Sequence, residues 1–291
     1  MNILVTGANG QLGRELRNQA SGSPHRFIFS DVTSVPGLDT VFLDITNIDA
    51  VRLVAESEGV DVIVNCAAYT DVDRAEDDSA MAELLNHTAA GVLAKVCSER
   101  DSTLVHISTD YIFSGEGCVP YREDDAPSPR SVYGSTKLAG EESVLHSGCS
   151  SIILRTAWLY SPYGKNFVKT IARLVDEKEQ IKVVFDQCGS PTYAADLAAL
   201  IVKILDKNMT ERCGVYHFTD EGAISWYDFA MAVRDLMGSP CEVLPCRSED
   251  YPARARRPHY SVLDKSLVKE TFDVKIPHWY DSLKECLERM K

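Results

Sequence analysis

The chain has 291 residues, of which 45% are hydrophobic and 25% charged, and these ordinary globular values exclude a disordered chain. Its formal net charge of −13 excludes nucleic acid as a partner, because phosphate backbones are bound by net basic surfaces. A local basic pocket for a small anion is still compatible with that charge.

The cysteines and the apolar runs indicate a cellular compartment. Nine cysteines are scattered from Cys66 to Cys286 without a C-x-x-C pair, which is typical of reduced thiols rather than of disulfides or a zinc site. No basic and apolar leader precedes the first strand, and no run approaches the ~20 apolar residues of a membrane span. We therefore expect a cytoplasmic protein that binds no membrane.

Short apolar runs alternate with amphipathic stretches through the first half of the chain. The runs predict buried strands around residues 3–5, 27–29, 62–64, 104–107 and 152–154. The stretches between them predict helices over residues 11–20, 47–58, 79–100 and 131–147. This alternation predicts an α/β fold with a doubly wound, Rossmann-like parallel sheet, which binds ligands at the carboxyl ends of its strands.

The second half of the chain is less regular. It predicts a helix over residues 163–178, a strand over 181–184 and a helix over 193–206. A loop-rich segment with four prolines, residues 238–263, follows, and we interpret it as part of a smaller lobe that closes over the cleft. The predicted division is a dinucleotide-binding domain (1–155, completed by about 181–215) and a smaller C-terminal substrate-binding lobe (156–180 and 216–291).

A glycine-rich turn joins the first strand to the first helix, with the spacing G-x-x-G-x-x-G. Glycines permit a tight turn and a close approach of the backbone to a pyrophosphate, and the helix N-terminus adds N–H donors. The spacing is one residue wider at its start than the G-x-G-x-x-G fingerprint. The cofactor contacts that we expect from this turn are Gly7, Gly10, Gln11, Leu12 and Gly13.

Three further residues are candidates for the adenosine half of a dinucleotide. Asp31 ends the second strand, where a carboxylate can bind the ribose 2′-OH and repel a 2′-phosphate, which favours NADH over NADPH. The alternative for Asp31 is a turn residue. Asp44 and Ile45 follow the apolar run 41–43 and can flank the adenine, although a plain helix cap is an equal alternative for this pair.

A Y-x-x-x-K pattern on a predicted helix indicates acid–base chemistry. Tyr133 and Lys137 are four residues apart and share a helix face, so an ammonium can stabilise the phenolate and lower its pKa. Tyr280 and Lys284 match the same pattern without a glycine turn or strand end nearby, and we interpret them as a chance match. Thr109, at the end of a strand, can polarise a substrate carbonyl, with a simple cap as its alternative role.

Several longer runs resemble those of a known family. Their sequences are NCAAYTDVD (65–73), HISTDYIF (106–113), VYGSTKLAGE (132–141), DQCGSPT (186–192) and RPHYSVLD (257–264). Together with the glycine turn, they are similar to the dTDP-4-dehydrorhamnose reductases of the extended short-chain dehydrogenase/reductase superfamily. The resemblance implies reduction of the 4-keto group of dTDP-4-dehydro-L-rhamnose to dTDP-L-rhamnose, for polysaccharide biosynthesis, with NADH or NADPH.

The same resemblance implies roles for individual residues. Thr109 and Asp110 would touch the sugar of the sugar-nucleotide substrate, Tyr133 would donate the proton, and Lys137 would support it while contacting the cofactor. Trp158 would bind the substrate through the flat apolar face of its indole, although without the resemblance a core position is an equal interpretation. Three further residues would line the nicotinamide half of the cofactor: Ala68, Tyr69 and Thr70.

Charged residues suggest a diphosphate site and raise the question of a metal. Arg254, Arg256 and Arg257 form the densest basic cluster, and we expect Arg257 to hold a diphosphate, with solvated surface ion pairs as the alternative. Some members of the family bind Mg²⁺ near a dimer interface, and Glu15 fits one such position. Where a second acid is expected, this chain has Ala195 followed by Asp196, which disfavours a metal and leaves a homodimer open.

Two other functions compete with keto-sugar reduction. An epimerase or 4,6-dehydratase shares the superfamily, but a dehydratase commonly has Asp-Glu after the threonine, and here Tyr111 follows Asp110. The regulatory subunit of methionine adenosyltransferase shares the fold and many of the motifs without catalysing the reduction. Activity on the sugar nucleotide distinguishes the enzyme from such a subunit.

Overall fold

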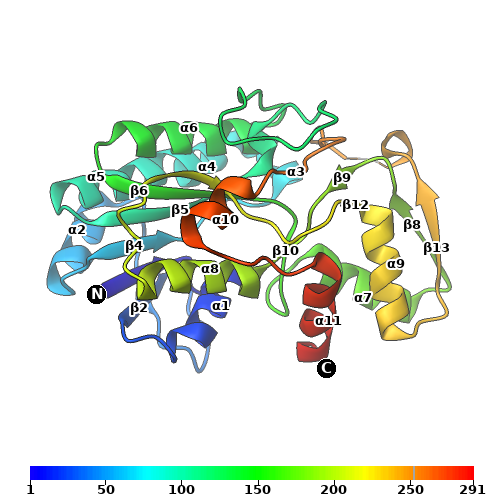
Figure 1. Cartoon of the computed structure of the whole chain (residues 1–291), viewed down its shortest axis with the longest axis horizontal. Coiled ribbons are helices and arrows are strands. Elements are labelled where there is room, and N and C mark those ends of the chain that lie inside the picture. The colour runs from blue at the N-terminus through cyan, green and yellow to red at the C-terminus, as the bar shows by residue number, and fades with distance from the viewer. Residues whose placement is uncertain (252) are drawn as a thin grey trace.

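Runs of aliphatic residues form a seven-stranded sheet in which every neighbouring pair of strands is parallel. The computed structural model describes residues 1–251 and 253–291, so Pro252 of the proline-rich segment lies outside the described residues. The strand order is β11-β6-β5-β4-β1-β2-β3. The chain runs from β1 outward to β3 at one edge, then returns to β4 on the other side of β1 and continues to β11, which confirms the doubly wound fold (Figure 1). The strands are β1 (Asn2–Thr6), β2 (Arg26–Asp31), β3 (Val41–Phe42), β4 (Val62–Asn65), β5 (Thr103–Thr109), β6 (Ser150–Thr156) and β11 (Gly214–His217).

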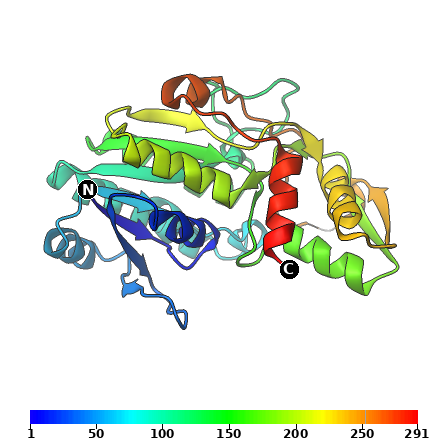
Figure 2. The same ribbon diagram turned by 60° about the horizontal axis from the view of Figure 1, so that its bottom comes forward.

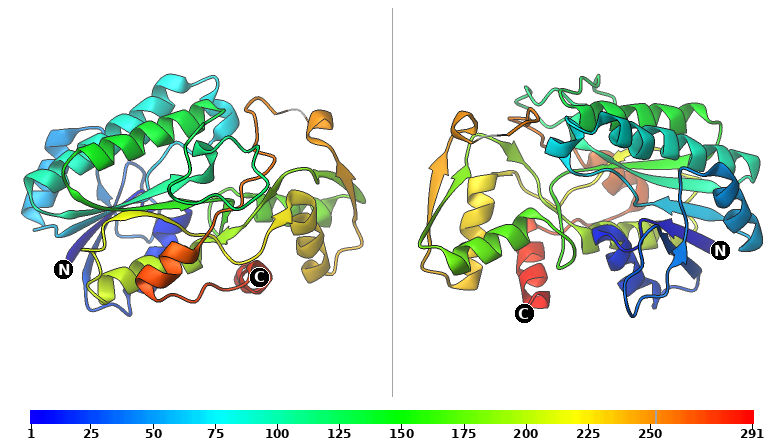
Figure 3. Two further views of the ribbon diagram at one scale, coloured as in Figure 1. Left: turned by 45° about the horizontal axis from the view of Figure 1, so that its top comes forward. Right: turned by 180° about the vertical axis from the view of Figure 1, so that it is seen from behind.

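Helices cover both faces of this sheet, because side chains alternate along each strand and both faces are apolar. On one face, the core that contains Ile3 and Val5 of β1 extends over the helices α1 (Gln11–Ala20), α8 (Ala194–Asp206) and α10 (Ser266–Phe272), with α10 lying against β11. On the other face, Leu4 and Ile63 pack with α2 (Ile48–Ser57), α5 (Ala89–Glu99) and α6 (Val132–His146) (Figure 3).

The predicted helix over 79–100 forms, but it contains a wider turn. It consists of α4 (Ser79–Glu83), a π-helical turn at Leu84–Thr88 and α5. π turns place an extra residue in one helical turn and are frequent at functional sites. A short helix, α3 (Val72–Ala75), precedes them and is capped by the Asp71 side chain.

A second apolar core forms a smaller lobe beyond the carboxyl edge of the sheet (Figure 2). Its helices are α7 (Phe167–Glu177), α9 (Trp226–Met237) and α11 (Trp279–Arg289). A parallel pair, β8 (Gln180–Val184) and β13 (Glu242–Cys246), covers them. The remaining short elements are β7 (Leu159–Tyr160) with β10 (Thr192–Tyr193), β9 (Cys188–Gly189) with β12 (Ile224–Ser225), and the 3₁₀ turns Asp110–Ile112 and Ser248–Asp250.

The structure corrects several expectations for the second half. The helix α7 begins at Phe167 rather than at residue 163, because the Asn166 side chain caps it by accepting the N–H of Lys169 at 3.0 Å. The loop-rich segment 238–263 also contains a strand that was not expected, β13, which pairs with β8. The strand β8 therefore belongs to the smaller lobe, while α8, β11 and α10 complete the large sheet domain. None of the helices in the described ranges is long and apolar enough to cross a bilayer.

Candidate active site

The glycine turn brings the N-terminus of α1 to the carboxyl edge of the sheet. Gly7 has a left-handed backbone with φ of +64°, a conformation that residues with side chains rarely adopt. Gly10 is the N-cap of α1 and, within the described residues, no side chain caps this helix. The N–H groups of its first turn can therefore bind an anion such as a pyrophosphate.

Two residues of this turn have side chains that are already engaged. The Gln11 Oε1 accepts hydrogen bonds from the Ser161 hydroxyl at 3.0 Å and from the Asn166 amide at 2.8 Å. The Leu12 side chain is buried in the core beneath α1. A contact of Gln11 or Leu12 with a dinucleotide would therefore come from the backbone N–H groups.

Asp31 occupies a place that is compatible with both roles considered for it. One carboxylate oxygen accepts the N–H of Asn9 at 3.1 Å, and the other accepts the N–H and the hydroxyl of Thr33 at 2.9 and 2.8 Å. Asp31 is thus a turn residue. Because a carboxylate has more acceptor sites than these three bonds use, it can also bind a ribose hydroxyl beside the glycine turn.

Asp44 and Ile45 follow β3, close to Asp31 in the sheet. Asp44 accepts the N–H and the hydroxyl of Thr46 at 2.9 and 2.7 Å, while the side chain of Asn47 caps α2. The helix-cap interpretation of Asp44 is therefore wrong. The Ile45 side chain is buried in the core on the α2 face, and contact of this pair with an adenine stays a prediction.

Ala68, Tyr69 and Thr70 follow β4, and a buried side chain from the π turn holds the middle residue of the three. The Asn86 amide accepts the Tyr69 N–H at 2.8 Å and donates to the Tyr69 carbonyl at 3.1 Å and to the Thr136 hydroxyl at 3.2 Å. Asn86 thus ties this segment to α6. Sequence reasoning missed Asn86, because apolar periodicity gives no signal for a π turn inside a helix.

The helix α6 approaches the end of β5 closely enough to bring Tyr133 to Thr109. Gly134 makes this possible, because a Cβ atom at that position would collide with the Tyr111 carbonyl oxygen. The Tyr133 ring packs edge-on against Tyr111, with ring centroids 5.4 Å apart. The Lys137 ammonium, one turn along α6, donates to the Ile107 carbonyl at 2.6 Å. The structure therefore brings the three predicted catalytic residues together.

One electrostatic expectation for this group is wrong. Burial raises the pKa of the Tyr133 phenol well above its ordinary value, although a hydrogen bond with Thr109 opposes the shift. The Lys137 ammonium donates to the Ile107 carbonyl instead of the phenol, and burial lowers the pKa of Lys137 itself to about 8. A phenol that stays protonated at neutral pH can act as a proton donor.

Thr109 and Asp110 are both buried where β5 ends. The Thr109 hydroxyl donates to the Asp110 carboxylate at 3.0 Å and accepts the Tyr111 N–H at 3.2 Å. The cap role of Thr109 is thus present alongside the predicted catalytic one. Burial raises the pKa of Asp110 to about 6, and the hydroxyls of Ser261 and Thr109 limit the rise.

A buried ion pair lies behind the catalytic group, and sequence reasoning assigned no role to it. Glu141 is two turns after Tyr133 on α6, and its carboxylate binds the Arg155 guanidinium of β6 at 2.8–3.2 Å. It also accepts a hydrogen bond from the Ser108 hydroxyl next to Thr109. The stripe formed by Tyr133, Lys137 and Glu141, each four residues apart, is the signal that could have indicated it.

Trp158 lies in the lobe against a second indole. Its backbone is left-handed, with φ of +49°, and its ring stacks on Trp226 at 3.5 Å between centroids. This stack agrees with the alternative of a core position for Trp158, and contact with a substrate stays a prediction. Trp226 has no local sequence signal, because only the tertiary fold brings it to Trp158.

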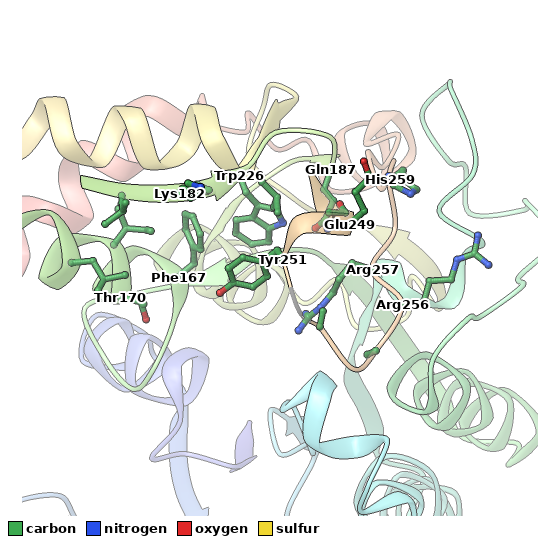
Figure 4. A pocket seen from close by; sticks show the side chains of 18 residues that line it. Phe167, Thr170, Lys182, Gln187, Trp226, Glu249, Tyr251, Arg256, Arg257 and His259 are labelled. Carbon is green, nitrogen blue, oxygen red and sulfur yellow. Dashed lines mark hydrogen bonds between the residues drawn. The ribbon is translucent and has the colours of Figure 1, made fainter. Parts of the chain in front are cut away.

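A cavity of about 580 Å³ opens between the lobe and the proline-rich segment (Figure 4). One part of the cavity is lined by the aromatic rings of Phe167, Trp226 and Tyr251, and Arg257 lines the opposite end. The Arg257 guanidinium is half-buried and donates to the Tyr111 hydroxyl at 3.1 Å, which places a cation next to the catalytic group. Arg254 and Arg256 are more exposed and form ion pairs at the surface, which is the alternative role considered for the cluster.

The position considered for a metal holds an arginine instead. The buried Glu15 carboxylate accepts from the Arg289 guanidinium at 2.9 Å and from the Asn18 amide at 3.1 Å. Asp196 accepts the Ser282 hydroxyl at 2.6 Å. Across residues 1–251 and 253–291, no three His, Cys, Asp or Glu side chains are grouped to hold a metal ion.

Comparisons with known proteins agree on one family. The model of the RmlD substrate binding domain family matches residues 1–291. A dTDP-4-dehydrorhamnose reductase from Aggregatibacter actinomycetemcomitans is 39% identical, over 97% of each chain. The crystal structure of such a reductase from Clostridium acetobutylicum is 40% identical with a TM-score of 0.92, and the match covers 100% of this chain and 99% of the other. The crystal structure of a reductase from Bacillus anthracis in complex with NADP is 36% identical with a TM-score of 0.91, over 99% of each chain.

Proposed function

Since the chain belongs to the RmlD substrate binding domain family, we propose that it reduces the 4-keto group of dTDP-4-dehydro-L-rhamnose to dTDP-L-rhamnose with NADH or NADPH. The observation that carries this proposal is the convergence of Thr109, Tyr133 and Lys137 at the sheet edge that also holds the glycine turn. A proton donor and a site for a hydride carrier are the two components that reduction of a ketone requires.

The chain's own residues supply the proton and the polarisation. The bound nicotinamide cofactor supplies the hydride that adds to the carbonyl carbon. When the substrate binds, the Thr109 hydroxyl turns its one proton from the Asp110 carboxylate to the carbonyl oxygen and stabilises the negative charge that develops there. Tyr133 transfers its phenolic proton to the same oxygen, so that the C=O group becomes an alcohol. Lys137 supports the group by contacting the bound cofactor, since its ammonium is directed at the Ile107 carbonyl rather than at the phenol.

The cavity beside the catalytic group suits the nucleotide part of the substrate. Its volume of about 580 Å³ lies within the usual range of ligand pockets, roughly 300–1,000 Å³. Aromatic rings such as Trp226 and Tyr251 can stack on a base, and Arg257 can bind a diphosphate between the base and the sugar. In a chain of net charge −13, such a local cation offsets the repulsion of an anionic substrate.

Asp31 supports a preference for one cofactor, and the cysteines support an assignment to one compartment. The carboxylate of Asp31 favours the ribose hydroxyl of NADH over the 2′-phosphate of NADPH, although a relative binds NADP. All nine cysteines are free thiols. We place the enzyme in the cytoplasm, where thiols stay reduced.

The test is direct. Purified protein is mixed with dTDP-4-dehydro-L-rhamnose and NADH or NADPH, and the loss of the reduced cofactor's absorbance is followed together with formation of the dTDP-sugar product. We expect turnover with the wild type and almost none with Tyr133→Phe. A wild-type protein that binds the cofactor but leaves the sugar nucleotide unchanged would contradict the proposal and favour a regulatory subunit.

A further inference from the structure

The segment 253–258, which we call the arginine strap, crosses from the smaller lobe to the sheet domain. Each of its three arginines forms an ion pair with an acid of the sheet domain: Arg254 with Asp77, Arg256 with Glu116 at 2.5 Å, and Arg257 with Asp73 at 2.5 Å. Figure 4 shows the Arg256 and Arg257 side chains leaving the strap in opposite directions. The strap is therefore held over the site by charges on both of its sides.

Asp73, in the short helix α3, differs from the other two acids because it binds the strap's backbone as well as a side chain. One carboxylate oxygen accepts the N–H groups of Arg254 and Ala255 at 3.2 and 3.0 Å, and the other accepts from the Arg257 guanidinium. Burial acts to raise the pKa of Asp73, but these hydrogen bonds and the Arg257 charge outweigh it and lower that pKa overall. Asp73 is thus a carboxylate at neutral pH.

The pair formed by Asp73 and Arg257 is connected to the catalytic group through one tyrosine. The second amino group of the Arg257 guanidinium donates to the Tyr111 hydroxyl at 3.1 Å, and the Tyr111 ring packs against Tyr133. These two bonds use only part of the guanidinium's N–H donors. The remaining donors belong to a side chain that lines the cavity of about 580 Å³.

We propose that Asp73 is a positioning residue for the sugar nucleotide, because it holds the arginine strap and aims the free donors of Arg257 at the substrate's diphosphate. The inference rests on the proposed function, and it adds a residue that touches neither the reacting atoms nor the substrate. A guanidinium that is fixed in advance loses less entropy when it binds an anion than one that is free to move. Asp73 should therefore contribute to affinity rather than to the chemical step.

The experiment compares Asp73→Asn with Asp77→Asn, a matched control that pairs with the strap only through one exposed side chain. The asparagine at position 73 keeps an acceptor for the backbone N–H groups but removes the charge that orients Arg257. We expect Asp73→Asn to raise the KM for the sugar nucleotide roughly 10- to 100-fold, the scale of one charge-assisted contact, with kcat changed much less. We expect Asp77→Asn to change KM by less than about 3-fold, as is usual for an exposed ion pair.

A double-mutant cycle separates this inference from the proposed function. If Asp73 acts through Arg257, the variant Asp73→Asn should have little further effect on KM in an Arg257→Met background. Asp73→Glu, which restores the charge, should recover part of the affinity. NADH binding should be unchanged in all these variants, because the glycine turn binds the cofactor in a separate place.

Each other outcome has a distinct meaning. A raised KM for Arg257→Met with a normal KM for Asp73→Asn would overturn the role of Asp73 and leave the proposed function intact. Normal KM values for both would show that the diphosphate binds elsewhere and would overturn that part of the proposed function as well. A lowered KM for Asp73→Asn would mean that Asp73 competes with the diphosphate, and a loss of NADH binding would mean that it supports the whole fold; both would overturn the inference.

Discussion

Replacing Asp110 by asparagine should change the stability of the protein in a pH-dependent way. The free energy of unfolding of the variant minus that of the wild type should be larger at neutral pH than at acid pH. Asp110 is buried beside Thr109, and burial raises its pKa from 3.8 to about 6. A carboxyl whose pKa is raised on folding binds its proton more tightly in the folded state. Its contribution to stability is therefore fully present below pH 3.8 and is lost as the pH rises through about 6.

The size of the effect follows from the shift. A rise of roughly two pKa units corresponds to about 3 kcal/mol between full protonation and full ionisation. Between about pH 4.5 and about pH 8, the same linkage gives about 2 kcal/mol, because the carboxyl of the unfolded chain is already mostly ionised at the lower pH. The asparagine side chain does not titrate. The difference in unfolding free energy between the variant and the wild type should therefore shift by about 2 kcal/mol in favour of the variant as the pH rises over this range.

Urea denaturation of both proteins at the two pH values measures this difference. The comparison between the two pH values cancels every effect of the asparagine amide that is the same at both, such as a hydrogen bond gained or lost by the substitution. A difference in unfolding free energy between wild type and Asp110→Asn that does not change with pH would refute the assignment of a raised pKa to Asp110. The kcat of the variant should fall at the same time, because the residue lies against the reacting group.

Three further substitutions test the site. Tyr133→Phe should lower kcat by roughly 10²–10⁴-fold with unchanged NADH binding, whereas Tyr280→Phe should leave steady-state kinetics normal; comparable losses in both would remove the proton-donor role. Asp31→Ala should shift the ratio of kcat/KM values toward NADPH by about 1–3 kcal/mol, and a constant ratio would make Asp31 a turn residue only. Gly134→Ala should force α6 away from the Tyr111 carbonyl and lower kcat about 10²-fold at a cost of about 1–3 kcal/mol in stability, so normal turnover would show that the close approach is unimportant.

The large sheet domain could be predicted from sequence because its signals are local. The predicted strands of the first half are apolar runs, and several predicted site residues lie at a strand end or in the first turn of a helix, as Thr109 and Tyr133 do. The smaller lobe could not be predicted in the same way. β13 contains Pro245 and forms only because β8, from a distant part of the chain, pairs with it. The two-residue strands depend likewise on tertiary contacts.

The site shows the same division. The Y-x-x-x-K pattern and the glycine turn are readable because spacing along one element determines them. The roles of Asn86, Trp226 and the partner of Glu141 are not readable, since each depends on a contact between different elements. The pKa of Tyr133 was predicted in the wrong direction because the spacing of Tyr133 and Lys137 does not show that the phenol is buried or that the ammonium binds a backbone carbonyl.

The position of α10 has a consequence for how the protein is made. Val268 and Phe272 of this helix, with Ile276 after it, are buried in the same core as Ile3 and Val5 of the first strand. A ribosome must therefore release almost the whole chain before the cofactor-binding domain can close its own core. Truncation from the C-terminus by a few dozen residues would remove α10 and expose apolar surface beside β11, where Phe272 packs against Tyr216.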